Sequence, residues 1–227
     1  MNERKMALLS QIIKQYIKSA TPVGSKLLAD KSSFDVSSAT IRNEMAELEK
    51  DGYIMHPYTS AGRIPTAKGY QYYLEQIEGG KLSQIEQNYL YRILKKHQAD
   101  KNEILIKELA KKIVELSHNT VVIGFSENEV YYTGISNLFC QPEFQDPEKI
   151  QTMSLIIDHL DSVMSDIFDQ IQELEVRIGE DNPFDNNCSV LLIPWGKRKK
   201  GILGILGPMR MDYEKNLGLV NFIIQNF

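Results

Sequence analysis

Residues 36–50 read VSSATIRNEMAELEK, and they predict the helix that decides the fold of the N-terminal part of the chain. Ser37 is a favourable N-cap for a helix from Ser38 to about Lys50, and Gly52 stands where a left-handed C-cap belongs. Apolar residues spaced three or four apart define the buried face of this helix: Ile41, Met45 and Leu48. We therefore expect an amphipathic helix that packs on its neighbours through one side.

The opposite face of this helix is suited to contact with DNA. Arg42 and Asn43 can form forked hydrogen bonds with guanine and adenine edges, and a small residue such as Ala39 lets the backbone approach the groove floor. Free N–H groups at the helix N-terminus favour a phosphate. The predicted contacts on this helix are Ser37, Ser38, Ala39, Thr40, Arg42 and Asn43. The alternative is a helix whose polar face is simply solvated.

The segments on either side of this helix complete a winged helix-turn-helix. Asn2 can cap a first helix with the apolar stripe Met6, Leu9, Ile13, Tyr16 and Ile17, and residues 24–29 form a short second helix. Two short strands, 53–57 and 63–65, then flank a hairpin tip, and Thr66 caps a further helix. Hairpin residues suited to phosphate or minor-groove contact are Thr59, Ser60, Gly62 and Arg63. For Arg63 the alternative is a surface salt bridge.

The remainder of the chain predicts an α+β domain. Paired glycines at 79–80 mark a joint, and Ser83 with Glu86 forms a capping box that opens a helix to about residue 98. Further helices are expected at 103–118, 147–174 and 212–226, and strands at 120–125, 130–134, 175–179, 189–195 and 202–207. This order favours a mostly antiparallel sheet. We divide the chain into a DNA-binding domain, 1–76, a linker helix region, 77–101, and an α+β domain, 102–227.

Composition is that of a soluble globular protein, with 42% hydrophobic and 25% charged residues. Neither an apolar run of membrane-spanning length nor a secretion signal is evident, and the two sparse cysteines suit a reducing compartment with buried, neutral thiols. The sequence thus predicts a cytoplasmic protein. The net charge is −4, but residues 1–76 carry 10 Lys and Arg against 8 Asp and Glu, so a mildly basic head precedes an acidic body.

No pattern indicates catalysis, a metal site or a cofactor. The four histidines stand apart, and there is no Cys-x-x-Cys pair. Residues 201–207, GILGILG, lack the ending of a phosphate loop and alternate as a strand, so close backbone packing explains their glycines better. The basic run 197–200, KRKK, is interpreted as a solvated hairpin loop, with a second phosphate contact as the functional alternative.

Several blocks together resemble the heat-inducible transcription repressor family HrcA. In the N-terminal part these are TPVGS at 21–25, VSSATIRNEMAELE at 36–49 and TSAGRIPT at 59–66. Farther along they are GISNL at 134–138, QPEF at 141–144, VRIGE at 176–180 and GILGPMRMDY at 204–213. The blocks lie at both ends and in between, so the resemblance covers most of the chain.

This resemblance implies a winged-helix head, a GAF-like domain and a dimerising domain inserted into the GAF-like one. It also implies repression of chaperone operons of the groE and dnaK type by a dimer bound to an inverted-repeat operator. The active state would depend on the chaperonin GroEL, and heat stress would release the operator. Here only a few residues separate 121–125 from 132–137, so the inserted domain is essentially absent. We expect the helix from Ser83 or an edge of the sheet to take over dimerisation.

Two alternatives remain at this stage. One is a transcription regulator whose GAF-like domain binds a metabolite, which a rise in melting temperature with ligand would reveal. The other is an enzyme with a regulatory winged helix, which would need an acid, a base and a nucleophile that the sequence does not bring together.

Overall fold

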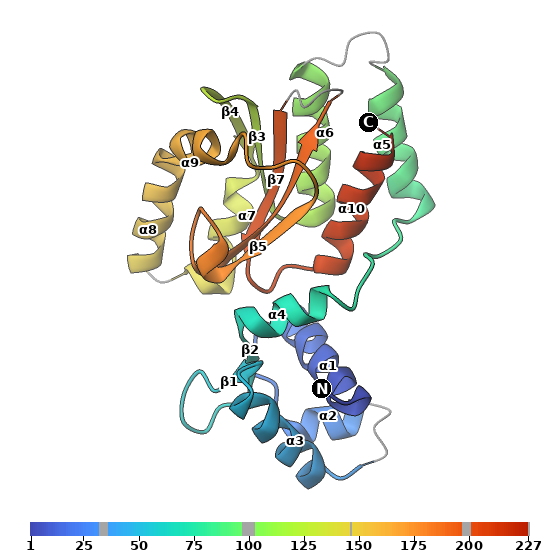
Figure 1. Cartoon of the computed structure of the whole chain (residues 1–227), viewed down its shortest axis with the longest axis vertical. Coiled ribbons are helices and arrows are strands. Elements are labelled where there is room, and N and C mark those ends of the chain that lie inside the picture. Colours follow the sequence, from blue (N-terminus) through green and yellow to red (C-terminus); the bar gives the residue numbers. More distant parts are fainter. Residues whose placement is uncertain (32–35, 97–102, 146, 197–200, 227) are drawn as a thin grey trace. The chain divides into compact units, whose positions relative to one another are not determined.

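The computed structural model describes residues 1–31, 36–96, 103–145, 147–196 and 201–226. The chain divides into two compact units, Met1–Ile77 and Glu78–Phe227 (Figure 1). The division falls beside the joint predicted at the paired glycines. The basic run at 197–200 and the cap expected at Asp146 lie outside the described residues.

Unit 1 has three helices followed by a short hairpin and a fourth helix. The helices are α1 (Glu3–Ser19), α2 (Ser25–Lys31), α3 (Ser38–Lys50) and α4 (Ala67–Leu74), and the strands are β1 (Ile54–Met55) and β2 (Ile64–Pro65). Asn2, Ser37 and Thr66 each accept a hydrogen bond from a backbone N–H in the first turn of α1, α3 and α4. The winged-helix order and the three caps are therefore as expected.

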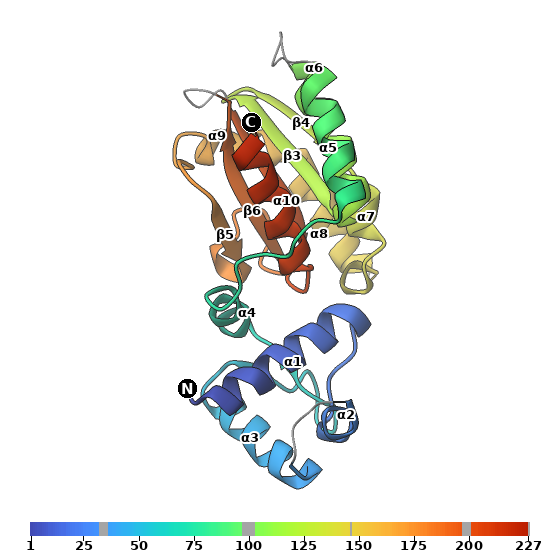
Figure 2. The ribbon, with the colours of Figure 1, turned by 90° about the vertical axis from the view of Figure 1, so that its right-hand side faces the viewer.

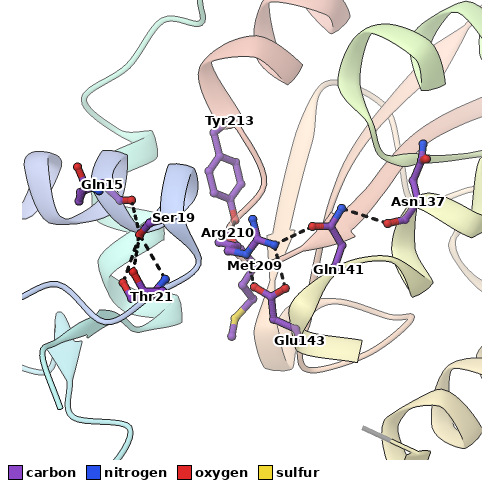
Figure 3. Close-up of polar contacts among 9 residues, drawn as sticks. All are labelled: Gln15, Ser19, Thr21, Asn137, Gln141, Glu143, Met209, Arg210 and Tyr213. Atoms are coloured by element: carbon purple, nitrogen blue, oxygen red, sulfur yellow. Dashed lines mark hydrogen bonds and ion pairs between the residues drawn. The ribbon is translucent and has the colours of Figure 1, made fainter. Parts of the chain in front are cut away.

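The core of unit 1 gathers around α1. Ile41, Met45 and Leu48 of α3 are buried, as expected. On α1 the buried residues are Leu8, Leu9, Ile12 and Ile13, whereas Met6, Tyr16 and Ile17 of the predicted stripe are only half-buried. Because α1 contacts α3, β2 and α4 together, its buried face is turned from the predicted one. The helix ends at Ser19, whose hydroxyl donates to the Gln15 carbonyl (Figure 3), and Ala20 caps it in a left-handed conformation.

Unit 2 is built on a five-stranded antiparallel sheet. Its strands are β3 (Thr120–Ser126), β4 (Glu129–Thr133), β5 (Glu175–Ile178), β6 (Cys188–Trp195) and β7 (Gly201–Pro208), in the order β4-β3-β7-β6-β5. Its helices are α5 (Gln84–Lys96), α6 (Glu103–Ser117), α7 (Ile135–Phe139), α8 (Pro147–Asp158), α9 (Leu160–Ile167) and α10 (Tyr213–Asn226), with 3-10 turns at Pro142–Phe144 and Gly179–Asp181. This is the predicted α+β fold with an antiparallel sheet.

Helices cover both faces of the sheet. Helices α7 and α9 pack on one face, with α8 beside α9, and α6 and α10 pack on the other (Figures 1 and 2). Strands β6 and β7 are therefore almost continuously apolar. At Gly207 a Cβ atom would lie 2.1 Å from Asn119 Oδ1, so close packing accounts for this glycine, as predicted.

Strands β3 and β4 form a tight hairpin. Ser126 pairs with Glu129, and residues 126–129 are all exposed. The chain therefore passes directly between the two strands, with no inserted domain at this point.

The prediction of one continuous helix over 147–174 was wrong. The chain forms α8 and α9 there, broken at His159, and the helical segment ends at Ile167. The break has no proline or glycine, and beyond it Leu160, Met164 and Ile167 are buried in the core against the sheet. Helix α7 was not predicted at all. Cys188 is buried, and burial raises the pKa of its thiol, but Cys140 is exposed, contrary to expectation.

Helix α5 begins with the predicted capping box. Glu86 N donates to Ser83 Oγ, and Ser83 N donates to Glu86 Oε2 over 2.8 Å. Residues 77–101 were predicted as a linker helix region, and the helix that they contain, α5, packs on α6 within unit 2. On α5, Leu90 is buried, whereas Ile85 and Tyr89 of the predicted stripe are exposed. Within the described ranges, no helix has the length and apolarity needed to cross a membrane.

Candidate nucleic-acid interface

The outward face of α3 carries the predicted base-reading residues. Arg42 and Asn43 are exposed, and neither side chain forms a hydrogen bond or ion pair with another residue that the structure describes. Ser37, Ser38 and Ala39 are exposed at the N-terminus of α3, and Thr40 is half-buried. Ser37 Oγ lies 3.0 Å from Thr40 Oγ1 and also accepts from Thr40 N, so it is engaged in the cap. Both side chains suited to base edges are thus available to a partner.

The carboxylates of α3 are neutralised by other parts of unit 1. Glu44 pairs with Arg4, and Glu47 lies 2.5 Å from Lys5 Nζ, both on α1. A hydrogen bond from Lys5 lowers the pKa of Glu47, so this carboxylate stays ionised and paired. Paired carboxylates repel a polyanion less than isolated ones do. Helix α3 can therefore face DNA in spite of its acidic residues.

The wing, residues 54–65, is closed by its own strand pairs and joined to the α1–α2 connection by a backbone bridge. Ile54 pairs with Pro65 and Met55 with Ile64. Val23 and Arg63 exchange two backbone hydrogen bonds of 2.8 and 2.9 Å, which adds a bridge from the α1–α2 connection. A Cβ at Gly62 would lie 2.6 Å from the Val23 carbonyl atoms, so glycine is required for this close approach. Gly62, predicted as a DNA contact, thus has a structural reason of its own.

A single carboxylate ties the wing to α3. Glu49 accepts a 2.9 Å hydrogen bond from Arg63 Nη2 through one oxygen and pairs with His56 Nδ1 through the other. Burial tends to raise the pKa of Glu49, but the hydrogen bonds from His56 and Arg63 outweigh burial and lower it. We call Glu49, His56 and Arg63 the clasp. It contains the salt bridge that was the alternative role for Arg63, whose side chain is 16% exposed.

The wing and α3 enclose a concave site, which we call the hollow. Its volume is about 390 Å³. Its walls come from Arg42 and Met45 of α3, from residues 23–25, and from His56 and residues 60–63 of the wing. The structure therefore brings Arg42, Ser60, Gly62 and Arg63 together.

Other predicted residues lie apart from the hollow. Thr59 is exposed in the wing, and Asn43, Ser37, Ser38, Ala39 and Thr40 are not among the residues that line it. Sequence reasoning missed His56 and Glu49. A signal for them existed, since an acid at the end of the predicted helix precedes a histidine and an arginine in the hairpin. The contacts of Glu49 with His56 and Arg63 depend on how the hairpin packs against α3.

The family-like segments of unit 2 meet in one polar network. Arg210 donates to both carboxylate oxygens of Glu143 and, over 2.7 Å, to Gln141 Oε1 (Figure 3). Tyr213 OH lies 2.6 Å from Ser189 Oγ and donates to the Met209 carbonyl. The Arg210 contacts fasten the segment after α7 to the turn between β7 and α10, and the Tyr213–Ser189 contact joins the start of α10 to β6. The residues serve to hold the fold of unit 2 together.

Residues 69–217 match the family model described as the HrcA protein C terminal domain. The chain belongs to the HrcA family. Because the match covers most of the chain, including the polar network of unit 2, it confirms the family that the sequence blocks indicated.

Curated HrcA proteins align with nearly the whole chain. The heat-inducible transcription repressor HrcA of Brevibacillus brevis is 28% identical over 330 residues, covering 99% of this chain and 96% of the relative. That of Natranaerobius thermophilus is 26% identical, covering 97% and 94%. The alignments are longer than the 227 residues of this chain, so both relatives contain a long stretch without a counterpart here.

One solved structure shares the fold. A crystal structure of a hypothetical protein superposes with a TM-score of 0.74, covering 99% of this chain and 97% of that one. At 18% sequence identity this likeness bears on the fold alone.

Proposed function

We propose that this HrcA-family chain is a heat-shock transcription repressor that binds operator DNA through α3 and the wing. The observation that carries the proposal is the exposed pair Arg42 and Asn43 on a helix whose carboxylates are paired elsewhere. In this assignment Arg42 and Asn43 contact base edges. Contacts with the DNA backbone come from Ser37, Ser38, Thr40, Thr59 and Ser60. Arg63 acts from within the clasp.

The repressor acts as a homodimer on an inverted repeat. A winged helix reads one half-site, and the two-fold symmetry of a dimer matches the symmetry of a palindromic operator. Release on heat stress, with the active state supported by the chaperonin, is the regulation that the family resemblance implies. Its relatives carry the name heat-inducible transcription repressor. The protein would act in the cytoplasm and would have no catalytic role.

A gel shift tests the proposal. Purified chain is titrated against the region upstream of the host's chaperone operon and against scrambled DNA, with and without chaperonin. Specific retardation is expected, and Arg42→Ala should weaken it by about 1–3 kcal/mol and relax specificity at one base position. Lys111→Ala, which removes an exposed cation of unit 2, is the control and should bind as the unmodified chain does. Equal retardation of both DNAs would contradict the proposal.

A second candidate function is a repressor that also responds to a small molecule. A cavity of about 370 Å³ in unit 2 favours it, lined largely by apolar side chains that include Leu174, Ile193, Trp195 and Ile223. Cavities of this size and character bind small ligands. A ligand that binds only the folded chain raises the melting temperature, so a thermal-shift screen of apolar metabolites tests this function.

A further inference from the structure

The clasp places a carboxylate where a DNA-binding surface would ordinarily exclude one. Glu49 lies at the end of α3, and its side chain is 29% exposed. Because a carboxylate repels a polyanion, charge alone predicts that removing Glu49 strengthens DNA binding. The structure gives Glu49 a second role, because it is the side chain that holds both stems of the wing.

Each arm of the clasp reaches a wall of the hollow. His56 follows β1 and Arg63 precedes β2, and both line the hollow with Arg42 of α3. The side chains of His56 and Arg63 are 35% and 16% exposed, so both stay within reach of a ligand at the rim. Ser60, also in the wall, is held at a φ of 86° and adds a hydroxyl.

The lining of the hollow suits an anion. Arg63 of the wing supplies a guanidinium group and His56 an imidazole ring, and the charge of Arg42, whose own side chain is assigned to a base edge, adds to the positive potential of the wall. Guanidinium groups bind phosphate through paired, charge-assisted hydrogen bonds. Glu49 offsets only one of these charges. The hollow therefore keeps a net positive charge even though Glu49 holds His56 and Arg63 in place.

We propose that the hollow receives a phosphodiester of the DNA backbone and that Glu49 is its positioning residue, strengthening DNA binding by holding His56 and Arg63 in place. The proposal rests on the proposed function and names a partner group for the wing. It assigns His56 to the DNA interface. It also means that Glu49 strengthens DNA binding, although its negative charge alone would weaken it.

The test measures operator affinity of the full chain by fluorescence anisotropy over a range of salt concentrations. Glu49→Gln should bind about three- to tenfold more weakly, and the slope of log K against log salt should become shallower by about 0.9, the value for one lost phosphate contact. Glu47→Gln is the matched control, one carboxylate on the same helix that pairs with Lys5 rather than with the wing. It should bind equally well or slightly more tightly.

Operator binding by Glu49→Gln that equals or exceeds that of the unmodified chain, at an unchanged or steeper slope, would overturn the proposal and leave the proposed function intact. Failure of the unmodified chain to bind the operator would overturn both.

A second variant keeps the proposal testable if Glu49→Gln fails to fold. His56 pairs with Glu49 and lines the hollow together with Arg42 and Arg63. His56→Gln retains the Glu49–Arg63 pair and removes the imidazole ring from the hollow. It should bind the operator about three- to tenfold more weakly than the unmodified chain at the same salt concentration. Operator affinity equal to that of the unmodified chain would overturn the assignment of His56.

Discussion

At the scale of single residues, Gly207 shows how little space the sheet of unit 2 leaves. An added Cβ would meet Asn119 Oδ1 at 2.1 Å, and Asn119 is itself buried. Gly207→Ala should therefore lower the free energy of unfolding by about 1–3 kcal/mol, measured by urea denaturation. Gly204→Ala on the same strand is the control. Its Cβ would meet the movable end of Leu192 at 3.1 Å, so a loss as large as that of Gly207→Ala would contradict this explanation.

Single residues also mark how far sequence reasoning could reach at the interface. The exposure of Arg42 and Asn43 followed from helical periodicity, because the buried residues Ile41, Met45 and Leu48 leave them on the other side. The partner of Arg63 did not follow. Glu49 is 14 residues away, and only the folded hairpin brings the two together.

At the scale of elements, the start of α5 is joined to α10 by one carboxylate. Glu86 pairs with Lys215 as well as completing the capping box with Ser83. The Lys215 hydrogen bond is the main reason that the pKa of Glu86 is lowered; burial opposes it, and Ser83 assists it. A carboxyl whose pKa is lower in the folded state stabilises the fold above its unfolded pKa, and this is lost as pH falls through the folded value.

Glu86→Gln should therefore destabilise the chain by about 1 kcal/mol at pH 7. The difference from the unmodified chain should shrink below about pH 4, close to the ordinary pKa of glutamate. Thermal unfolding followed by circular dichroism across this pH range checks the expectation. A difference that persists unchanged at pH 3 would show that the carboxylate charge is not the cause.

Elements were predicted well where local signals are strong and poorly where tertiary packing decides. Asn2, Ser37, Thr66 and Ser83 are caps written into the sequence, and each helix begins where its cap indicates. The break at His159 has no local signal, because it arises from the need of α9 to reach the sheet.

At the scale of the whole molecule, the proposed homodimer predicts dependence on both halves of the operator. Two linked winged helices bind an inverted repeat with an effective concentration that a single half-site cannot provide, so a duplex with one half-site scrambled should bind at least about 100-fold more weakly. Sedimentation of the complex should show two chains on each intact operator. Equal affinity for the intact and half-scrambled duplexes would argue that one chain binds alone.

The β3–β4 hairpin has a practical consequence for the molecule as a whole. Its tip is exposed at residues 126–129, and the two strands that it joins lie side by side. Surface tips of this kind tolerate spliced-in domains, since the two points of attachment are already adjacent. A fluorescent reporter whose own termini lie close together can be grafted there, giving a labelled protein whose α3 and wing keep their native sequence.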